Sequence, residues 1–215
     1  MIPWTRPYIG AFEREAFDRV WESSWFSQGK EVEAFEEELA NYIGCKYAVC
    51  VNSGTSGLIL AYLAAKNIVR SRYEDIDILA FISNSTFAAT SNIAEILNIP
   101  YVALDIDKET GICNANKIME LKYCYRNKCK IIIPVHLLGN VVNYTKQFID
   151  SLNDKEFFIE DGCQSFGSID LNGMLGSISK VCVFSFHAAK IISTVEGGCL
   201  AINDDEIYKM VKLLR

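Results

Sequence analysis

One lysine stands out because of the residues around it. Lys190 follows the apolar run 181–186, which only Ser185 interrupts, and it precedes the glycine-containing segment 196–198. Such a run is typical of a buried strand, and polar and glycine residues are typical of the loop at its end. A primary amine in that loop could react with a bound ligand. On this window alone, a surface lysine after a core strand is an equally good interpretation.

A carboxylate, Asp161, lies at the end of a second predicted strand, 157–160. A buried carboxylate is unfavourable without a cationic partner. The protonated ring nitrogen of pyridoxal 5′-phosphate (PLP) would be such a partner, because the charge pair keeps the ring able to accept electrons. Phe87, after the predicted strand 78–82, could lie on the face of the ring. A phenylalanine at this position is, however, more often a core residue.

A third group is the polar segment 52–57, between a predicted strand, 47–51, and a predicted helix, 58–66. The start of a helix offers unpaired N–H groups and a positive dipole end, which suit a phosphate. Gly54 would let the backbone approach such a ligand, and the neighbouring hydroxyls are those of Ser53, Thr55 and Ser56. By itself, this pattern more often marks an ordinary capped helix start.

The elements that would position these groups alternate between strands and helices. Two amphipathic helices are expected first, over 11–21 and 32–43, the second ended by Gly44. Further strands are expected at 101–104 and 130–135, and further helices at 86–97, 116–122, 144–152 and 204–215. This alternation predicts an α/β fold in three layers, with a mostly parallel sheet between helices and no second sheet. Ligands of such sheets bind beyond the carboxyl ends of the strands, where the groups above should meet.

Composition limits the class of protein. The chain has 215 residues, half of them apolar, which is enough for one domain with a large core. It contains neither an apolar run long enough to cross a bilayer nor an apolar leader segment, so we expect no membrane partner and a cytoplasmic location. The net charge of −6, without a basic stripe, argues against nucleic-acid binding.

The eight cysteines are expected to be reduced thiols, because several lie in apolar runs where a thiol packs as a small hydrophobe. Structural zinc is the alternative. No Cys-x-x-Cys pair occurs and the chain has only two histidines, His136 and His187, so we expect no metal.

Four segments, SGTSGL, STFAATSN, IEDGCQSFGS and FSFHAAKIISTVEGG, resemble the DegT/DnrJ/EryC1/StrS family of PLP-dependent nucleotide-sugar aminotransferases. The segment 25–58 also resembles the corresponding segment of that family, so the resemblance covers nearly the whole chain. It implies the aspartate aminotransferase-like fold of a PLP-binding large domain. It also implies Lys190 as the Schiff-base lysine, Asp161 as the partner of the ring nitrogen and Phe87 as the stacking aromatic. The other implied cofactor contacts are Gln164, near the phenolic oxygen, and Gly54, Thr55 and Ser185, at the phosphate.

The reaction that the resemblance implies is transfer of an amino group from an amino acid, glutamate, to a nucleotide-linked keto-deoxysugar, which yields an amino sugar. The sequence around Lys190 is most similar to the corresponding segment of enzymes that aminate C4 of a dTDP-4-keto-6-deoxyhexose. A sugar 3-aminotransferase, a PLP-dependent sugar dehydratase and a non-catalytic PLP-binding or regulatory protein remain alternatives. The dehydratase is disfavoured, because those relatives resemble this family but carry histidine where this chain has Lys190.

The sequence departs from the family pattern in two places. Gly162 and Cys163 stand where the family usually has two alanines, which is an exchange of small residues. Family members also continue beyond the helix at 204–215 into a smaller C-terminal domain. We therefore expect residues 1–215 to be a truncated large domain, with a helical segment over 1–45 and an α/β core over 46–215. The full-length form is expected to be a homodimer, and the isolated chain to be an impaired enzyme.

Overall fold

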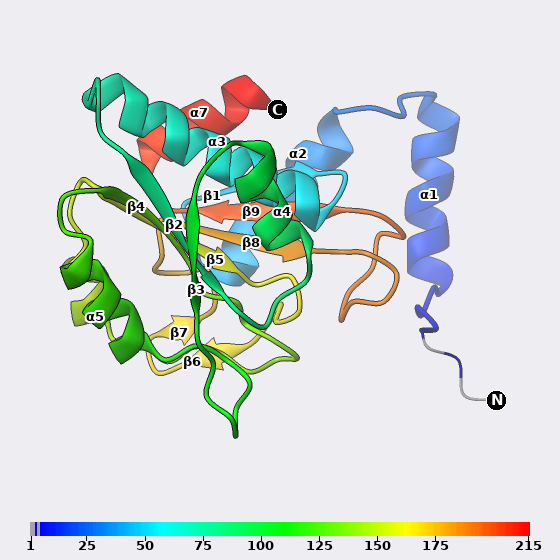
Figure 1. Ribbon diagram of the computed structural model, residues 1–215. Helices are drawn as coiled ribbons and strands as arrows, with labels where there is room; N and C mark the ends of the chain where they lie inside the picture. Colours follow the sequence, from blue (N-terminus) through cyan, green and yellow to red (C-terminus); the bar gives the residue numbers. More distant parts are fainter. Residues whose placement is uncertain (1–2, 4) are drawn as a thin grey trace.

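A seven-stranded sheet forms the middle layer of the molecule (Figure 1). The computed structural model describes residue 3 and residues 5–215. The strands lie in the order β1 (Tyr47–Val51), β9 (Gly198–Ile202), β8 (Val181–Ser185), β5 (Glu156–Asp161), β4 (Cys129–Ile133), β2 (Ile78–Ser83) and β3 (Tyr101–Leu104). Neighbours from β8 to β3 are parallel, whereas β9 is antiparallel to both β8 and β1. All of these strands except β9 therefore end at the same edge of the sheet.

Helices cover both faces of the sheet, as predicted. One face packs against α3 (Gly54–Arg72), α4 (Ala89–Ile96) and α7 (Asp205–Leu214), through buried residues such as Leu58, Ile93 and Val211. The other face packs against α2 (Lys30–Ile43), α5 (Ala115–Cys124) and α6 (Lys146–Asp150). The three-layer, mostly parallel α/β fold expected from the alternation of elements is thus confirmed.

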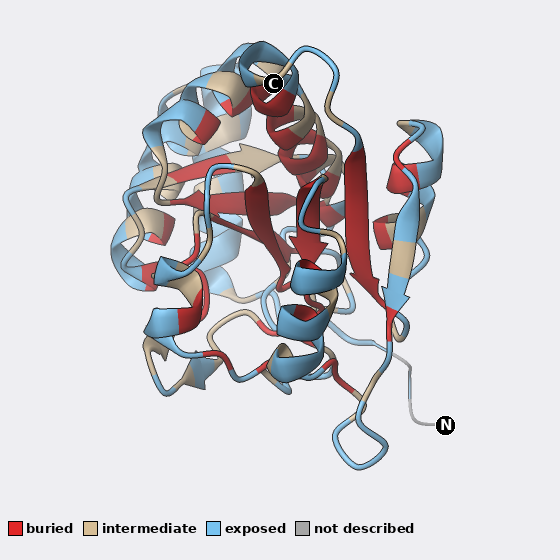
Figure 2. Ribbon diagram, turned by 60° about the vertical axis from the view of Figure 1, so that its left-hand side comes forward, coloured by how far each residue is buried: buried red, intermediate tan, exposed pale blue. Residues whose placement is uncertain are grey.

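The strands owe their stability to burial on both sides. Every residue of β2, β4, β5, β8 and β9 is buried, and Figure 2 shows these strands as the least exposed part of the molecule. Because no strand face meets water, their sequences are mainly apolar and do not alternate with polar residues, apart from the buried charges of β4 and β5. The long run 181–186 could be recognised as a strand for this reason.

Two helix starts differ from the predicted ones by three residues or more, and the others by at most two. Helix α3 begins at Gly54 rather than at residue 58, because the Ser53 hydroxyl accepts a hydrogen bond from the backbone nitrogen of Ser56 (3.1 Å) and caps it. The polar segment predicted as a turn is therefore the first turn of α3. Helix α4 begins at Ala89 rather than at residue 86, so Phe87 lies in the loop before it.

The sheet also contains features that were not predicted. Strand β9 was not expected, since its apolar residues follow the glycine pair that was interpreted as a loop. The expectation of no second sheet was wrong, because β6 (Ile169–Asp170) and β7 (Gly173–Met174) form a two-stranded one. Such a short hairpin has no apolar run that could reveal it.

The N-terminal helix α1 (Ala11–Ser23) stands apart from the three layers (Figure 1). None of its residues is buried, and Phe12, Phe17 and Trp21 are exposed. In the described part of the chain, no helix has both the length and the apolarity needed to cross a bilayer. All eight cysteines are free thiols, and the described residues contain no cluster of three or more His, Cys, Asp or Glu that could hold a metal ion.

Candidate active site

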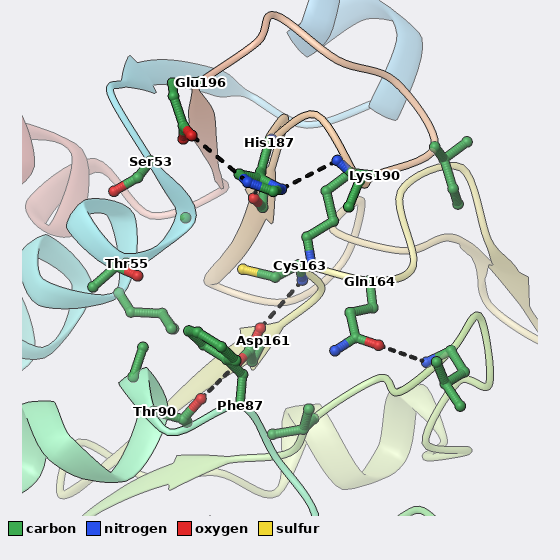
Figure 3. Close-up of a pocket in the computed structure, with 18 residues that line it drawn as sticks. Ser53, Thr55, Phe87, Thr90, Asp161, Cys163, Gln164, His187, Lys190 and Glu196 are labelled. Atoms are coloured by element: carbon green, nitrogen blue, oxygen red, sulfur yellow. Dashed lines mark hydrogen bonds and ion pairs between the residues drawn. The ribbon is translucent and has the colours of Figure 1, made fainter. Parts of the chain in front are cut away.

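A pocket of about 590 Å³ opens at the edge of the sheet where the strands end (Figure 3). The loops that follow β1, β2, β4, β5 and β8 all contribute to its lining. The structure brings together in this one pocket all of the predicted site residues, which are Gly54, Thr55, Phe87, Asp161, Gln164, Ser185 and Lys190.

Asp161, the last residue of β5, forms the floor of the pocket and is only 4% exposed. Its Oδ2 accepts a hydrogen bond from Thr90 Oγ1 (2.7 Å), and its Oδ1 accepts one from the backbone nitrogen of Cys163 (3.2 Å). Both donors are neutral. Among the described residues, Asp161 forms no ion pair.

The two other buried carboxylates have more partners than Asp161 in the described chain. Glu156 lies 2.9 Å from Lys122 Nζ and 3.5 Å from Lys130 Nζ. Within the part of the chain that the structure describes, Glu160 has no cation beside it but accepts three neutral hydrogen bonds, from the Tyr144 and Ser179 hydroxyls and from Nε2 of His136 (3.1 Å), whose Nδ1 accepts from a backbone nitrogen. Asp161 has only two neutral donors and lines the pocket, so it is the buried carboxylate with the least support in the described chain, which suits a cationic ligand.

The start of helix α3 forms one wall of the pocket. A Cβ on Gly54 would lie 2.7 Å from Cys163 Sγ and 2.9 Å from Ser185 Cβ, so only glycine fits between these residues. The close approach places the first turn of α3, with the Thr55 hydroxyl, beside Ser185 at the end of β8. Backbone N–H groups at a helix start together with two hydroxyls form a suitable cradle for a phosphate.

Lys190 lies in the loop that joins β8 to β9. Its backbone nitrogen donates to His187 O (2.9 Å), and its side chain extends toward Asp161 and Cys163 (Figure 3). His187 Nδ1 accepts a hydrogen bond from the backbone nitrogen of Ala189 (3.1 Å), which assigns the proton to Nε2, 3.6 Å from Glu196 Oε1. This local bonding holds the lysine loop in shape at the mouth of the pocket.

Phe87 and Gln164 line opposite parts of the pocket. Phe87 is 69% exposed, so its interpretation as a core residue is wrong, and it lines the same pocket as Asp161 (Figure 3). Gln164 Oε1 accepts a hydrogen bond from the backbone nitrogen of Leu138 (3.3 Å), so its amide nitrogen turns into the pocket. A flat ring with a cationic nitrogen could lie against Phe87, with its nitrogen toward Asp161.

Three of the pocket residues that escaped prediction are Thr90, Leu138 and Cys163. Thr90 was hidden inside a predicted helix, and Leu138 follows a strand without any distinctive pattern. Cys163 was regarded only as a small residue, although its sulfur lies against Gly54. For Cys163, its place two residues after Asp161 was the one available signal. For the other two, no sequence signal was available.

The three-layer architecture, with its pocket at the carboxyl edge of a mostly parallel sheet, is that of fold type I PLP-dependent enzymes. Within that class, the sequence matches one particular family. The chain belongs to the DegT/DnrJ/EryC1/StrS aminotransferase family, whose model matches residues 7–215.

Its relatives by sequence include uncharacterized protein MJ1066 of Methanocaldococcus jannaschii, 34% identical over 215 residues, and spore coat polysaccharide biosynthesis protein SpsC of Bacillus subtilis, 32% identical over 213 residues. These matches cover 100% and 99% of this chain but 53% and 52% of the relatives. The chain thus spans about half the length of the curated relatives that it matches.

Solved structures of similar proteins also match nearly all of this chain and about half of their own length. GDP-4-keto-6-deoxy-D-mannose-3-dehydratase of E. coli, with bound hydrated PLP, has a TM-score of 0.87 and 27% identity over 100% of this chain and 54% of that one. PseC of Helicobacter pylori, an aminotransferase involved in the biosynthesis of pseudoaminic acid, has a TM-score of 0.84 and 28% identity over 99% of this chain and 55% of that one.

Proposed function

We propose that this chain carries the PLP site of an enzyme that transfers an amino group from an amino acid to a nucleotide-linked keto-sugar. The observation that carries the proposal is Asp161, a buried carboxylate without a cation that shares a pocket with Lys190. Membership of the family and the PLP-bound neighbour support the same cofactor.

The residues present fit PLP, and each has a distinct task. The first turn of α3, with Gly54 and Thr55, would bind the phosphate together with Ser185. Phe87 would cover one face of the ring, and Gln164 would donate from its amide to the ring oxygen. Asp161 would pair with the ring nitrogen and remain ionised.

When bound, PLP supplies an aldehyde that condenses with amines and a ring that accepts electron density. Lys190 would hold the aldehyde carbon through Nζ until the amino donor displaces it. The freed Nζ would then take a proton from the donor's Cα and return it within the same pocket. The direction of the side chain supports both tasks, since it extends from its loop toward Asp161 (Figure 3).

Our proposal also names the amino donor and the sugar acceptor. We take glutamate as the donor and a dTDP-4-keto-6-deoxyhexose, aminated at C4, as the acceptor, with a sugar 3-aminotransferase as the alternative. A second candidate is a sugar dehydratase, because a relative with that name is similar over the whole chain. The lysine at position 190 favours amination. Mass spectrometry of the sugar product separates an amine from a deoxygenated keto-sugar.

The experiment that tests the cofactor site is reduction with borohydride in the presence of PLP, followed by peptide mapping. A pyridoxyl group should appear on Lys190, and Lys190→Ala should lose it. Lys146→Ala is a matched control, because Lys146 is exposed on α6 and, within the described part of the chain, forms an ion pair with Asp150 alone. A label confined to other lysines would exclude the proposed role of Lys190.

We further propose that the 215 residues alone turn over poorly. Three apolar side chains at the pocket are exposed, namely Phe87, Leu138 and Ile191, so the chain by itself does not exclude water from the site. In the full-length form, the missing cover would come from additional chain and from a second subunit of a homodimer. Formation of 2-oxoglutarate from glutamate and keto-sugar should be at least about tenfold slower than in a full-length homologue, a barrier difference of about 1.4 kcal/mol. A smaller difference would contradict this proposal.

A further inference from the structure

Thr90 touches three of the parts that build the pocket. It lies in the first turn of α4, and no part of it is exposed to solvent. Its Oγ1 donates to Asp161 Oδ2 (2.7 Å) and lies 2.8 Å from Thr86 Oγ1. Its backbone oxygen accepts a hydrogen bond from the Tyr62 hydroxyl (2.8 Å) on α3. Thr90 therefore connects the floor of the pocket with α3 and with the loop that carries Phe87.

The direction of these hydrogen bonds follows from the charge on Asp161. An ionised carboxylate can only accept, so the single hydroxyl proton of Thr90 is committed to Asp161. In the contact between the two threonines (2.8 Å), Thr86 is then the donor, and this contact is shorter than the 3.3 Å from the same hydroxyl to Phe87 O. The result is an oriented chain from Thr86 to Thr90 to Asp161. Such a chain strengthens the terminal bond, because hydrogen bonds to a charged acceptor are about twice as strong as neutral ones and neighbours polarise one another.

Thr90 matters more here because few other groups stabilise the carboxylate. The second hydrogen bond to Asp161, from the Cys163 nitrogen, is longer at 3.2 Å. In the described chain, no basic side chain shares the task. The Thr90 hydroxyl is thus the principal group that both stabilises the charge on Asp161 and sets the direction of its Oδ2.

We propose that Thr90 is a positioning residue, which keeps the Asp161 carboxylate hydrogen-bonded and aimed at the ring nitrogen of the cofactor. The inference rests on the proposed function and deepens it, since a hydroxyl bonded to Asp161 rather than to the ligand would set the strength of the Asp161 contact. The same residue also couples the position of Phe87 to that of Asp161, through the Thr86 hydroxyl that precedes it in the loop.

A double-mutant cycle on PLP affinity tests this proposal in the 215-residue chain. Thr90→Val removes the hydroxyl at nearly constant shape and should weaken PLP binding at least about tenfold, whereas Thr90→Ser keeps the donor and should stay within about threefold of the wild type. In an Asp161→Asn background, Thr90→Val should change the affinity by less than about twofold, because the charged acceptor is already gone.

Ser83→Ala provides the control for loss of a buried hydroxyl. Ser83 lies at the end of β2, and its Oγ is without a hydrogen-bond partner among the described residues. Its removal should leave PLP affinity unchanged. Thermal unfolding of each cofactor-free variant shows whether the chain is folded, and the affinity of folded chains is then compared.

Three results would overturn the inference. If Thr90→Val binds PLP as tightly as the wild type, the hydroxyl has no role in binding. If Thr90→Ser and Thr90→Val lose affinity equally, or if Thr90→Val costs the same in the Asp161→Asn background, the role of Thr90 is structural. A wild-type chain that fails to carry PLP on Lys190 would instead overturn the proposed function itself. The borohydride experiment on the wild type separates that failure from the other three results.

Discussion

A Cβ atom on Gly198 would lie only 2.7 Å from the backbone nitrogen of Gly54. The same atom would lie 2.7 Å from Phe184 O and 2.8 Å from Ser53 C, so rigid backbone surrounds it on several sides. The first residue of β9 therefore packs directly against the first turn of α3. This contact makes the antiparallel strand a support for the proposed phosphate cradle.

Gly198→Ala is accordingly expected to damage both stability and cofactor binding. Because backbone cannot rotate away as a side chain can, we expect a loss of about 1–3 kcal/mol in the free energy of unfolding, as for an overpacked core. PLP affinity should fall at least tenfold, since the first turn of α3 must shift. Urea unfolding and a PLP titration measure the two effects.

Gly111→Asn is the control for this variant. Among the described residues, no atom lies within 4 Å of a Cβ placed on Gly111, and asparagine tolerates the φ of +72° at this position. If Gly198→Ala behaves like the control, the close contact has no role.

Asp161→Asn should change stability and binding in opposite directions. The substitution removes an uncompensated buried charge, and the Thr90 hydroxyl can hydrogen bond to either atom of the amide. We expect the cofactor-free chain to become more stable by about 1 kcal/mol, or roughly 2–4 °C in melting temperature. PLP affinity should fall at least tenfold, and turnover in a full-length enzyme by about 10²-fold or more. A variant with unchanged PLP affinity would show that the carboxylate serves the fold alone.

Glu156→Gln tests the opposite end of β5. The change leaves the two buried ammonium groups of Lys122 and Lys130 without their carboxylate, so we expect a loss of about 3–5 kcal/mol in the free energy of unfolding. PLP affinity of the folded fraction should not change, because Glu156 begins the strand that Asp161 ends. Glu120→Gln, in the exposed pair with Lys117, is the control and should cost less than about 0.5 kcal/mol. Equal losses in the two variants would contradict this account.

Thiol reactivity should single out one cysteine. Burial raises the pKa of the Cys50 thiol to about 12 and that of Cys113 to about 11. It also raises the pKa of Cys45, Cys129, Cys163, Cys182 and Cys199. A raised pKa lowers the fraction of reactive thiolate at pH 8, whereas Cys124 is exposed. We expect Ellman's reagent to modify one thiol rapidly in the folded chain, and all eight after denaturation. Several fast thiols in the folded state would show that the sheet is less tightly packed than the structure indicates.

The amino-acid sequence by itself was enough to predict the fold class and the meeting of Lys190, Asp161 and the start of α3 at one edge of the sheet, whereas the proposed roles of Gln164 and Ser185 came from the resemblance to the family. The reason is physical. Continuous apolar runs identify strands buried on both faces, and alternation with helices requires those strands to be parallel. Their carboxyl ends then lie at one edge, so Lys190, Asp161 and Gly54 were expected to meet although they are distant in the chain.

Only the tertiary structure decided which neutral groups support those residues. Thr90 is 71 residues from Asp161 in the chain, and their hydrogen bond depends on how α4 packs beside the end of β5. Gly198 looked like part of a flexible loop, yet its lack of a side chain is required by the start of α3, which a local pattern cannot reveal. The roles proposed for Phe87 and Gln164 likewise depend on a ligand-sized space that forms when five strand ends come together. Local sequence records the conformation of each segment, whereas the distances between segments are set by the order of the strands and by packing across the sheet.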